Sequence, residues 1–274
     1  MPELPDVEVF KRTFEAKALE KRISTVNVFD HRILAETSTS DLRGALEGDR
    51  FVEAQRVGKH LLARLSAGDW LAFHFGMTGF FKAFEDLAED PDHDSARFDF
   101  EDGVHLAYCS TRKLGEIRLV QSLDRYVQSK GLGIDPLDPE LTVDRFVELF
   151  FTKRGKTKNR LIRQDVVSGF GNIYSDEILY QAGIHPETPV QDLTRVEMVR
   201  MYEVMHEVIN AAVEQGADPE RLPDWFLIPH RTPGGRCPLC STELEVIEKS
   251  GRRSYACPAC QPRPEKRQNR ASQA

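Results

Sequence analysis

The sequence lacks any long hydrophobic run. Its most apolar stretch, WLAFHFGMTGFF at residues 70–81, is interrupted by His74. A membrane-spanning helix needs about 20 consecutive apolar residues, which excludes this stretch. The first residues also lack the basic start and apolar segment of a signal peptide. We therefore expect a cytoplasmic protein with no membrane contact.

The sequence also lacks an excess of positive charge, since its net charge at pH 7 is −7. The charges are unevenly distributed, however. Residues 85–102 hold nine acids and one arginine, whereas residues 153–163 hold six basic residues and no acid. Residues 249–270 hold seven basic residues and one acid. Clusters of this kind are typical of a surface that binds phosphate, and a solvated charged face is the alternative.

The pattern of hydrophobic residues changes along the chain. Residues 6–22 have helical spacing, with Pro5 near the helix start. Short β-rich runs separated by Gly, Asp and Ser follow over residues 20–125 and predict an antiparallel sandwich or barrel. After a Gly- and Pro-rich linker at 130–141, the spacing predicts helices at 142–154, 172–183 and 194–216. Thr194 and Glu197 form a predicted capping box, and the last 14 residues have the composition of a disordered basic tail.

Cysteine is scarce, yet four of the five cysteines form two pairs. The sequences CPLC and CPAC give the spacing C-x2-C-x16-C-x2-C, with an alternating segment and a KSGR turn between them. This spacing predicts one structural zinc ion held by a β-hairpin. Two disulfides or a redox pair are the alternatives, and a reducing compartment disfavours disulfides. The ligands would be Cys237, Cys240, Cys257 and Cys260, whereas Cys109 is expected to be a buried small hydrophobe.

The segment SGFGNIYSDE places glycines directly before a predicted helix. Asn172 is expected to cap this helix, whose N-terminal N–H groups and dipole suit a phosphate. An ordinary Gly/Asn cap is the alternative. The nearby basic run, which includes Lys158, favours a nucleic-acid phosphate.

Three features together resemble one family. PELPDVE at the tip, GFGNIYSDEILYQAGIHP in the middle and the four-cysteine segment are similar to the formamidopyrimidine-DNA glycosylase / endonuclease VIII family, from Pro2 to about Gln261. The resemblance implies an α+β multidomain fold: an antiparallel β-sandwich with an N-terminal helix (1–130), a helix–two-turn–helix domain (131–228), a zinc-finger β-hairpin (229–262) and a basic tail (263–274). It implies a bifunctional DNA glycosylase and abasic-site lyase of base excision repair.

The resemblance also assigns roles to the tip. Removal of Met1 would free the α-amine of Pro2 to attack the anomeric carbon of a deoxyribose and form a Schiff base. Glu3 would protonate the ring oxygen and transfer protons, and Lys59 would contact phosphate and assist catalysis. Elimination would then nick the strand. Asp6 would supply a second carboxylate.

Further positions match the family's DNA contacts. Met77 would fill the gap left by a flipped base, and Arg112 would face the partner base. Leu114 would act as an apolar wedge. Phosphate contacts would come from Lys158, Asn172 and Arg252. We expect the acidic residues 85–102 to stay clear of DNA.

Three features depart from the family pattern. Asp6 replaces the usual glutamate, and Leu114 replaces an aromatic wedge. Residues 216–237 lack the Gly-Tyr-Phe loop that is tied to oxidised guanine. The shortened segment favours the endonuclease VIII-like branch and oxidised pyrimidines, whereas PELP is the tip of the other branch, so both lesion classes stay open.

The prediction is therefore a monomeric, nucleoid-associated enzyme acting on double-stranded DNA that carries oxidised bases or abasic sites. The alternatives are a non-catalytic zinc protein that keeps the fold and binds damaged DNA, and an RNA-binding zinc module. RNA binding without a preference for damaged DNA would identify the latter.

Overall fold

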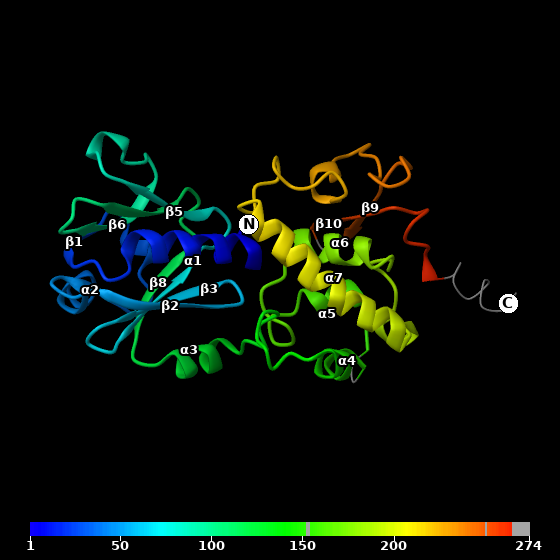
Figure 1. Ribbon diagram of the computed structural model, residues 1–274, viewed down its shortest axis with the longest axis horizontal. Helices are drawn as coiled ribbons and strands as arrows, with labels where there is room; N and C mark the ends of the chain where they lie inside the picture. Colours follow the sequence, from blue (N-terminus) through cyan, green and yellow to red (C-terminus); the bar gives the residue numbers. More distant parts are fainter. Residues whose placement is uncertain (152–153, 250, 265–274) are drawn as a thin grey trace, which may run out of the picture. The chain divides into compact units, whose positions relative to one another are not determined.

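A computed structural model describes residues 1–151, 154–249 and 251–264 (Figure 1). The backbone divides into two compact units, one covering Met1–Gly131 and the other beginning at Leu132. Within the described residues, no helix combines the length and apolar character needed to cross a bilayer. The predicted disordered tail lies outside the described residues from 265 onward. The finer boundaries proposed for the helical domain and the finger stay predictions.

The first unit is a sandwich of two antiparallel sheets. One sheet has the order β1–β6–β7–β5 and the other β2–β3–β4–β8. Its strands are β1 (Ile23–Val28), β2 (Phe51–Val57), β3 (His60–Leu65), β4 (Trp70–His74), β5 (Gly79–Phe84), β6 (Asp94–Phe100), β7 (His105–Ser110) and β8 (Glu116–Val120). The inward side chains of both sheets form one apolar core, which confirms the predicted sandwich.

Helix α1 (Leu4–Ala18) packs against β2, β3 and β5, so it contacts both sheets (Figure 1). Its buried residues include Leu4, Val7, Phe14 and Ala18, which recur at helical spacing. The Phe14 ring lies 4.9 Å from that of Phe51 and 5.9 Å from that of Phe73. The predicted helix is confirmed, although it ends four residues earlier than expected. Its apolar face fixes the N-terminal tip on the sandwich.

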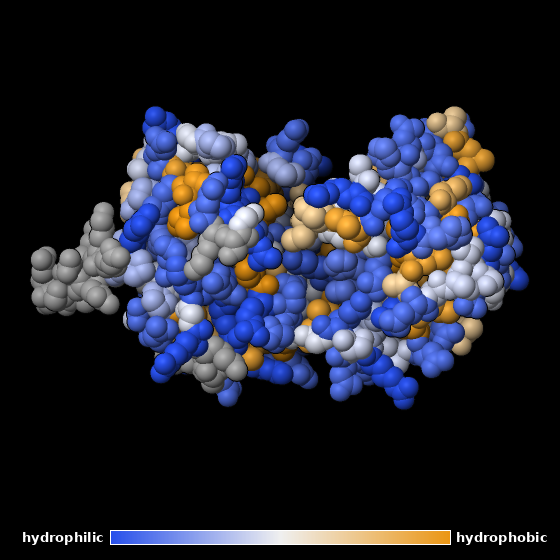
Figure 2. Space-filling model, turned by 180° about the vertical axis from the view of Figure 1, so that it is seen from behind, coloured by the Kyte–Doolittle hydropathy of each residue, from blue (hydrophilic) through white to orange (hydrophobic). Residues whose placement is uncertain are grey.

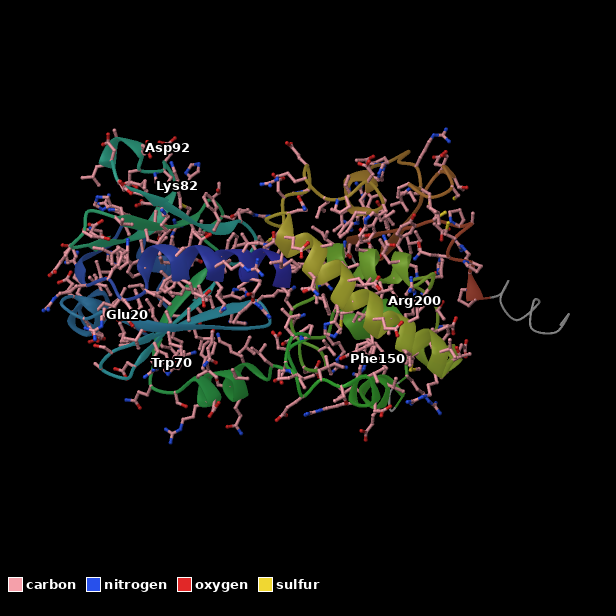
Figure 3. All side chains as sticks on the ribbon, viewed as in Figure 1. Glu20, Trp70, Lys82, Asp92, Phe150 and Arg200 are labelled. Atoms are coloured by element: carbon pink, nitrogen blue, oxygen red, sulfur yellow. The ribbon has the colours of Figure 1, made fainter. Side chains whose placement is uncertain are left out.

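Short helices that the periodicity did not predict complete this unit. They are η1 (His31–Ile33), α2 (Thr39–Leu46), η2 (Leu87–Glu89) and α3 (Leu123–Lys130). Each is too short to establish a 3.6-residue period in the sequence. The acidic segment 85–102 forms η2, an exposed turn that carries Asp92, and then β6; Lys82 of β5 donates to the carbonyl oxygen of Glu89 (Figure 3).

The second unit is helical, with a terminal hairpin. Its helices are α4 (Val143–Phe151), α5 (Thr157–Leu161), α6 (Asn172–Gln181), η3 (Val190–Asp192), α7 (Arg195–Glu214) and η4 (Ile228–His230). Strands β9 (Glu245–Lys249) and β10 (Arg252–Ala256) form the two-stranded sheet. Thr194 accepts from the N–H of Glu197, which confirms the capping box of α7. Phe150 of α4 is buried and lies 4.6 Å from the Phe146 ring (Figure 3).

Candidate active site and nucleic-acid interface

The N-terminal tip is held by the first turn of α1. Glu3 is the N-cap residue: its side chain accepts from the N–H of Asp6, and its own N–H donates to Asp6 Oδ2 at 2.8 Å. Glu3 is only 1% exposed, while Pro2 before it is half-buried. The reciprocal bonds fix the direction in which Pro2 leaves the helix. A buried carboxylate therefore stands directly beside the second residue of the chain.

Asp6 lies in the first turn of α1, where its carboxylate accepts from the N–H of Glu3 and so caps the helix. Burial raises the pKa of Asp6 to about 6, against the hydrogen bond from the Glu3 backbone, which lowers it. The nearby Glu3 carboxylate raises this pKa further. The pKa of Asp6 therefore lies closer to neutral pH than that of an ordinary carboxyl.

We expect Asp6→Asn to remove a pH dependence of stability. Burial raises the pKa of Asp6 in the folded protein above its value in the unfolded chain. Protonated Asp6 therefore contributes to the free energy of unfolding below about pH 4, and this contribution is lost as the pH rises through 6. Relative to Asp6→Asn, the native protein should lose on the order of 2 kcal/mol of unfolding free energy between pH 4 and 7. Urea unfolding across this range measures it. Asp41 occupies the same capping position in α2 but is exposed, so Asp41→Asn is the matched control and should show no such trend.

Lys59 lies in the two-residue turn that joins β2 to β3, where Gly58 has a φ of +58°. Arg56 connects this turn to α1: its Nε donates to Glu8 Oε2 at 2.7 Å, and its NH1 donates to the Gly58 carbonyl oxygen at 3.0 Å. Its side chain is only 4% exposed. Arg56 was not predicted from the sequence, because nothing in the local pattern shows that a strand arginine faces α1.

The other side of the Lys59 turn is fixed by a buried polar pair. His60 Nδ1 lies 2.8 Å from the hydroxyl of Tyr126 on α3. Burial lowers the pKa of His60 to about 3, so the ring is neutral at physiological pH. The turn that carries Lys59 is thus connected on one side to α1 and on the other to α3.

Met77, Arg112 and Leu114 lie on two adjoining loops of the sandwich. The N–H of Arg112 donates to Thr78 Oγ1 at 3.1 Å. A Cβ atom on Gly76 would lie 2.4 Å from the carbonyl oxygen of Leu114, so only glycine permits this approach of the two backbones. Met77 is 39% exposed and Leu114 54% exposed. The structure therefore brings the three predicted DNA-facing residues together on one surface.

In the second unit, Lys158 belongs to a buried polar network. Its Nζ donates to Asp176 Oδ1 at 2.5 Å, to Asn172 Oδ1 at 2.7 Å and to Ser254 Oγ at 2.7 Å. Asp176 also accepts from Arg231 NH2 at 2.8 Å and from the N–H of Tyr255 at 3.1 Å. The Asp176 side chain is 0% exposed. One carboxylate thus holds two cations and the backbone of β10 against α6.

The prediction that Asn172 caps its helix was wrong. Gly171 is the N-cap residue of α6, and Asn172 is the first helical residue. The Asn172 side chain instead accepts from Lys158 and donates through Nδ2 to the Arg253 carbonyl oxygen at 2.6 Å. It therefore joins the helix to the hairpin, because its oxygen accepts from a lysine and its nitrogen donates to a carbonyl oxygen of β10.

The structure pairs or buries several of the positive charges in the basic run 153–163. Lys153 lies outside the described residues. Lys156 pairs with Glu187, and Arg163 NH2 lies 2.5 Å from Asp165 Oδ2. Arg160 is buried and donates to the Leu149 carbonyl oxygen at 2.8 Å. These internal contacts neutralise or bury much of the charge. Glu187 lies 31 residues from Lys156, so the linear pattern could not show this pair, whereas Asp165 lies only two residues beyond Arg163.

A pocket of 390 Å³ lies where the hairpin meets the helices. Its lining includes Lys156, Lys158, Asn159, Asn172, Arg252 and Ser254. Arg252 is exposed at the start of β10, whereas the neighbouring Arg253 pairs with Glu248 at 2.6 Å. Arg252 is an exposed cation suited to a phosphate group, whereas Lys158 and Asn172 already have partners inside the protein, and the carboxylate of Glu187 also lines the pocket. The three predicted phosphate contacts therefore converge at one place.

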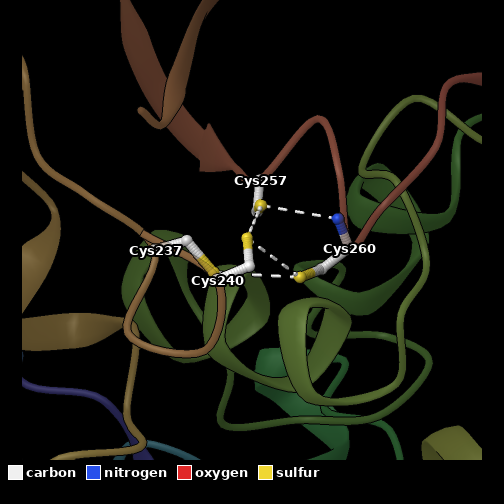
Figure 4. A group of neighbouring side chains, drawn as sticks. All are labelled: Cys237, Cys240, Cys257 and Cys260. Atoms are coloured by element: carbon white, nitrogen blue, oxygen red, sulfur yellow. Dashed lines mark hydrogen bonds between the residues drawn. The ribbon is translucent and has the colours of Figure 1, made fainter. Parts of the chain in front are cut away.

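The four cysteines of the two C-x2-C sequences lie close together (Figure 4). Their sulfur atoms all lie within 4.8 Å of one another, with Sγ–Sγ distances of 3.8 Å for Cys237–Cys260, 3.5 Å for Cys240–Cys257 and 3.6 Å for Cys240–Cys260. Zinc–sulfur bonds of about 2.3 Å give a tetrahedron with edges of about 3.8 Å, so this donor set fits the ion. With four protein ligands, the ion would have no open position for chemistry. Cys109 is buried as predicted.

The AGIHP motif explains how the cysteine segment docks on the helices. His185, which is fully buried, places Nε2 2.5 Å from Glu245 Oε1 of β9. Gln261 donates through Nε2 to the Ile184 carbonyl oxygen at 2.8 Å and accepts from the N–H of Cys257 at 2.9 Å. The motif therefore couples the metal-ligand turns to the helical body.

The predicted site residues are distributed over both units. The first unit contains the residues of the N-terminal tip, of the Lys59 turn and of the two exposed loops. The second unit contains Lys158, Asn172, Arg252 and the four cysteines. The sequence did not predict Arg56, Asp176 or Arg231, because their partners are far away in sequence. A space-filling view of the molecule shows a largely hydrophilic face with separate apolar patches (Figure 2).

Two family models match the chain. The formamidopyrimidine-DNA glycosylase N-terminal domain matches residues 1–117, and the formamidopyrimidine-DNA glycosylase H2TH domain matches residues 132–223. The formamidopyrimidine-DNA glycosylase of Pelotomaculum thermopropionicum is 31% identical over 95% of this chain and 99% of its own length. That of Streptococcus pneumoniae is 32% identical over 96% of this chain and 100% of its own length.

Solved structures of Lactococcus lactis formamidopyrimidine-DNA glycosylase have the same fold. One, bound non-covalently to DNA containing an abasic site, has a TM-score of 0.85 at 26% identity and covers 95% of this chain and all of that chain. Another, of the wild-type enzyme with DNA containing N7-benzyl-Fapy-dG, has a TM-score of 0.86 at 26% identity and covers 96% of this chain and all of that chain.

Proposed function

Because this chain belongs to the formamidopyrimidine-DNA glycosylase family, we propose that it is a DNA glycosylase of base excision repair with abasic-site lyase activity. The observation that carries the proposal is the tip: a buried Glu3 carboxylate, fixed by a reciprocal cap, directly follows Pro2. This arrangement supplies an acid at a fixed position beside an amine that is exposed when Met1 is removed. The substrate would be double-stranded DNA with oxidised bases or abasic sites.

The reaction would begin at the Pro2 amine. Its lone pair attacks C1′ of the deoxyribose, the bond between C1′ and the base breaks, and the base leaves with that electron pair and takes up a proton. Glu3 protonates the ring oxygen as the sugar opens, which leaves an iminium between Pro2 and C1′. Loss of a proton from C2′ then expels the 3′ phosphate, and a second elimination expels the 5′ phosphate. Water releases the amine, and the strand is nicked.

Other residues would position the DNA. Lys59 lies in a turn fixed by Arg56 and is suited to hold a phosphate near the tip. Met77, Arg112 and Leu114 would occupy the space of the extruded nucleotide and contact its partner base. Lys158, Asn172 and Arg252 line the pocket in the second unit, where a backbone phosphate would bind.

The four cysteines would hold one structural zinc ion, which metal analysis of the purified protein tests. When bound, the ion would stabilise the turns that support β9 and β10. Cys237 Sγ lies 3.2 Å from the Tyr180 hydroxyl, and Cys240 Sγ lies 3.2 Å from Thr242 Oγ1, so both sulfurs have supporting partners. We expect the working protein to be a cytoplasmic, nucleoid-associated monomer.

A panel of duplexes, each with one oxidised purine, one oxidised pyrimidine or an abasic site, tests this function. We expect base release and strand incision with at least one lesion and none with undamaged DNA. Affinity should fall steeply between low and moderate salt, because several phosphates are bound. Tight binding of damaged duplexes without base release or incision would instead identify a non-catalytic damage-binding protein, and salt-independent affinity would contradict the phosphate contacts.

A further inference from the structure

The loop that carries Arg112 and Leu114 has an unusual backbone at the residue between them. Lys113 has a φ of +52°, a left-handed conformation that residues with a Cβ atom rarely adopt. Its neighbours on both sides are exposed. Conformations of this kind persist only when surrounding contacts enforce them. The contacts of Lys113 therefore identify what holds this loop.

The Lys113 side chain binds to the sandwich itself. Its Nζ donates to Ser95 Oγ at 3.0 Å and lies 3.9 Å from Asp30 Oδ2, and the side chain is only 24% exposed. Ser95 is fully buried in β6. The ammonium is thus directed to a pair of protein oxygens that we call the Lys113 anchor, formed by Ser95 and Asp30.

The anchor is fixed independently of Lys113. The carbonyl oxygen of Ser95 accepts from the N–H groups of Phe29, at 3.0 Å, and Asp30, at 3.1 Å. Arg32 donates to Asp30 Oδ1 at 2.9 Å and to Oδ2 at 2.6 Å. The bonds from Arg32 lower the pKa of Asp30 to about 2, so this carboxylate is charged at neutral pH. The Lys113 ammonium therefore meets a rigid acceptor of opposite charge.

The same loop is fastened to the loop of Met77. The N–H of Lys113 donates to the Ser110 carbonyl oxygen at 3.2 Å, while Arg112 bonds to Thr78 and the backbone of Leu114 abuts Gly76. A displacement of Lys113 would accordingly move the exposed arginine and the exposed leucine together.

From these contacts we propose that Lys113 is a positioning residue for recognition of the base opposite the lesion. It fixes the strained loop through the Lys113 anchor, so that Arg112 meets the partner base in one orientation. The inference rests on the proposed glycosylase function. It assigns to Lys113 an effect on the choice of opposite base and not on the chemistry at Pro2.

The test compares Lys113→Met with the native protein on one lesion placed opposite each of the four bases. Loss of the charge-assisted bond should reduce the preference for the favoured partner base about tenfold. Borohydride trapping on single-stranded DNA with an abasic site, which has no partner base, should stay within about twofold of the native rate. An unchanged preference in Lys113→Met, with normal incision by the native protein, overturns the inference; no incision by the native protein overturns the proposed function instead.

Three further variants separate anchoring from direct DNA contact. Ser95→Ala removes one oxygen of the anchor and Asp30→Asn removes its charge, and neither changes Lys113 itself, so both should reduce the preference in the same direction as Lys113→Met. Lys113→Gly relieves the left-handed backbone but lacks the ammonium, so it too should lose the preference. If Lys113 contacts a phosphate instead, Lys113→Met should weaken binding equally for all partner bases and reduce the salt slope by about one, with Ser95→Ala silent. That outcome, or a preference retained by Lys113→Gly, overturns the inference. Thermal melting of each variant confirms that it is folded.

Discussion

Protein whose N-terminal proline is blocked should form no borohydride adduct with DNA that carries an abasic site. A variant with an added glutamine between Met1 and Pro2 keeps its initiator methionine, because only a small second residue permits removal, and it brings no new side-chain amine. The proline nitrogen is then part of a tertiary amide and has no basic lone pair. We expect adduct formation and strand incision to fall on the order of 10³-fold or more, the scale of losing a catalytic nucleophile.

The choice of Pro2 over Lys59 has a physical basis. An α-amine titrates near pH 8, whereas a lysine titrates above 10, so at neutral pH far more of the α-amine carries a free lone pair. Peptide mapping of the reduced adduct of native protein should find the sugar on Pro2. An adduct that survives in the blocked protein, or one mapped to Lys59, would contradict the assignment.

Two further variants support the interpretation. Glu3→Gln keeps an acceptor oxygen for the N–H of Asp6, so the cap and the fold should persist while proton transfer is lost. Glu15 lies on the same helix but pairs with Lys11 on its outer face at 3.0 Å, so Glu15→Gln is the matched control. Incision should fall in the first variant and stay near the native rate in the second.

Asp176→Asn should strongly destabilise the second unit. The native carboxylate compensates two cations, Lys158 and Arg231, whose side chains are 7% and 11% exposed. Removing one partner of a buried ion pair leaves the remaining charges uncompensated and costs about 3–5 kcal/mol. The asparagine oxygen would accept one of the lost hydrogen bonds but would bring no negative charge. Urea unfolding, followed by fluorescence of Trp225 in a Trp70→Phe background, measures the change.

The same substitution should weaken binding to DNA. Asp176 holds the backbone of β10 through the N–H of Tyr255, and this strand carries Arg252 to the pocket. Removing a negative charge by itself would favour phosphate, but the disturbed docking of the hairpin has the larger cost. Asp165 pairs with Arg163 on the exposed surface, so Asp165→Asn should change stability by less than about 1 kcal/mol. Equal stability of the two variants would contradict the role given to Asp176.

The cysteine site was predictable because its information is local. Two C-x2-C pairs each place two sulfurs on one turn, and the alternation between them specifies a hairpin. The structure brings all four sulfurs together as expected. Helix α1 and the strands of the sandwich were likewise predictable. The spacing of their apolar residues is helical in α1 and alternating in the strands, and it indicates which side faces the core.

The network around Lys158 was not predictable. Its partners Asn172, Asp176 and Ser254 are 14, 18 and 96 residues away in sequence. The same applies to Arg56, which meets Glu8 across 48 residues, and to Lys113, which meets Ser95 across 18. No periodicity records such pairs, because only the packing of separate elements brings the atoms together.

By itself the sequence determined the order of the β-rich, helical and cysteine-bearing segments, since hydrophobic period, glycine and proline positions and cysteine spacing act within a few turns or strands. Tertiary structure alone decided which charges remain available to a phosphate. Most residues of the basic run are paired with acids or buried, whereas Arg252 is exposed. Asn172, which was predicted to cap α6, binds to the hairpin instead. The physical reason is that burial and electrostatic pairing depend on distances in space, which the order of residues does not contain.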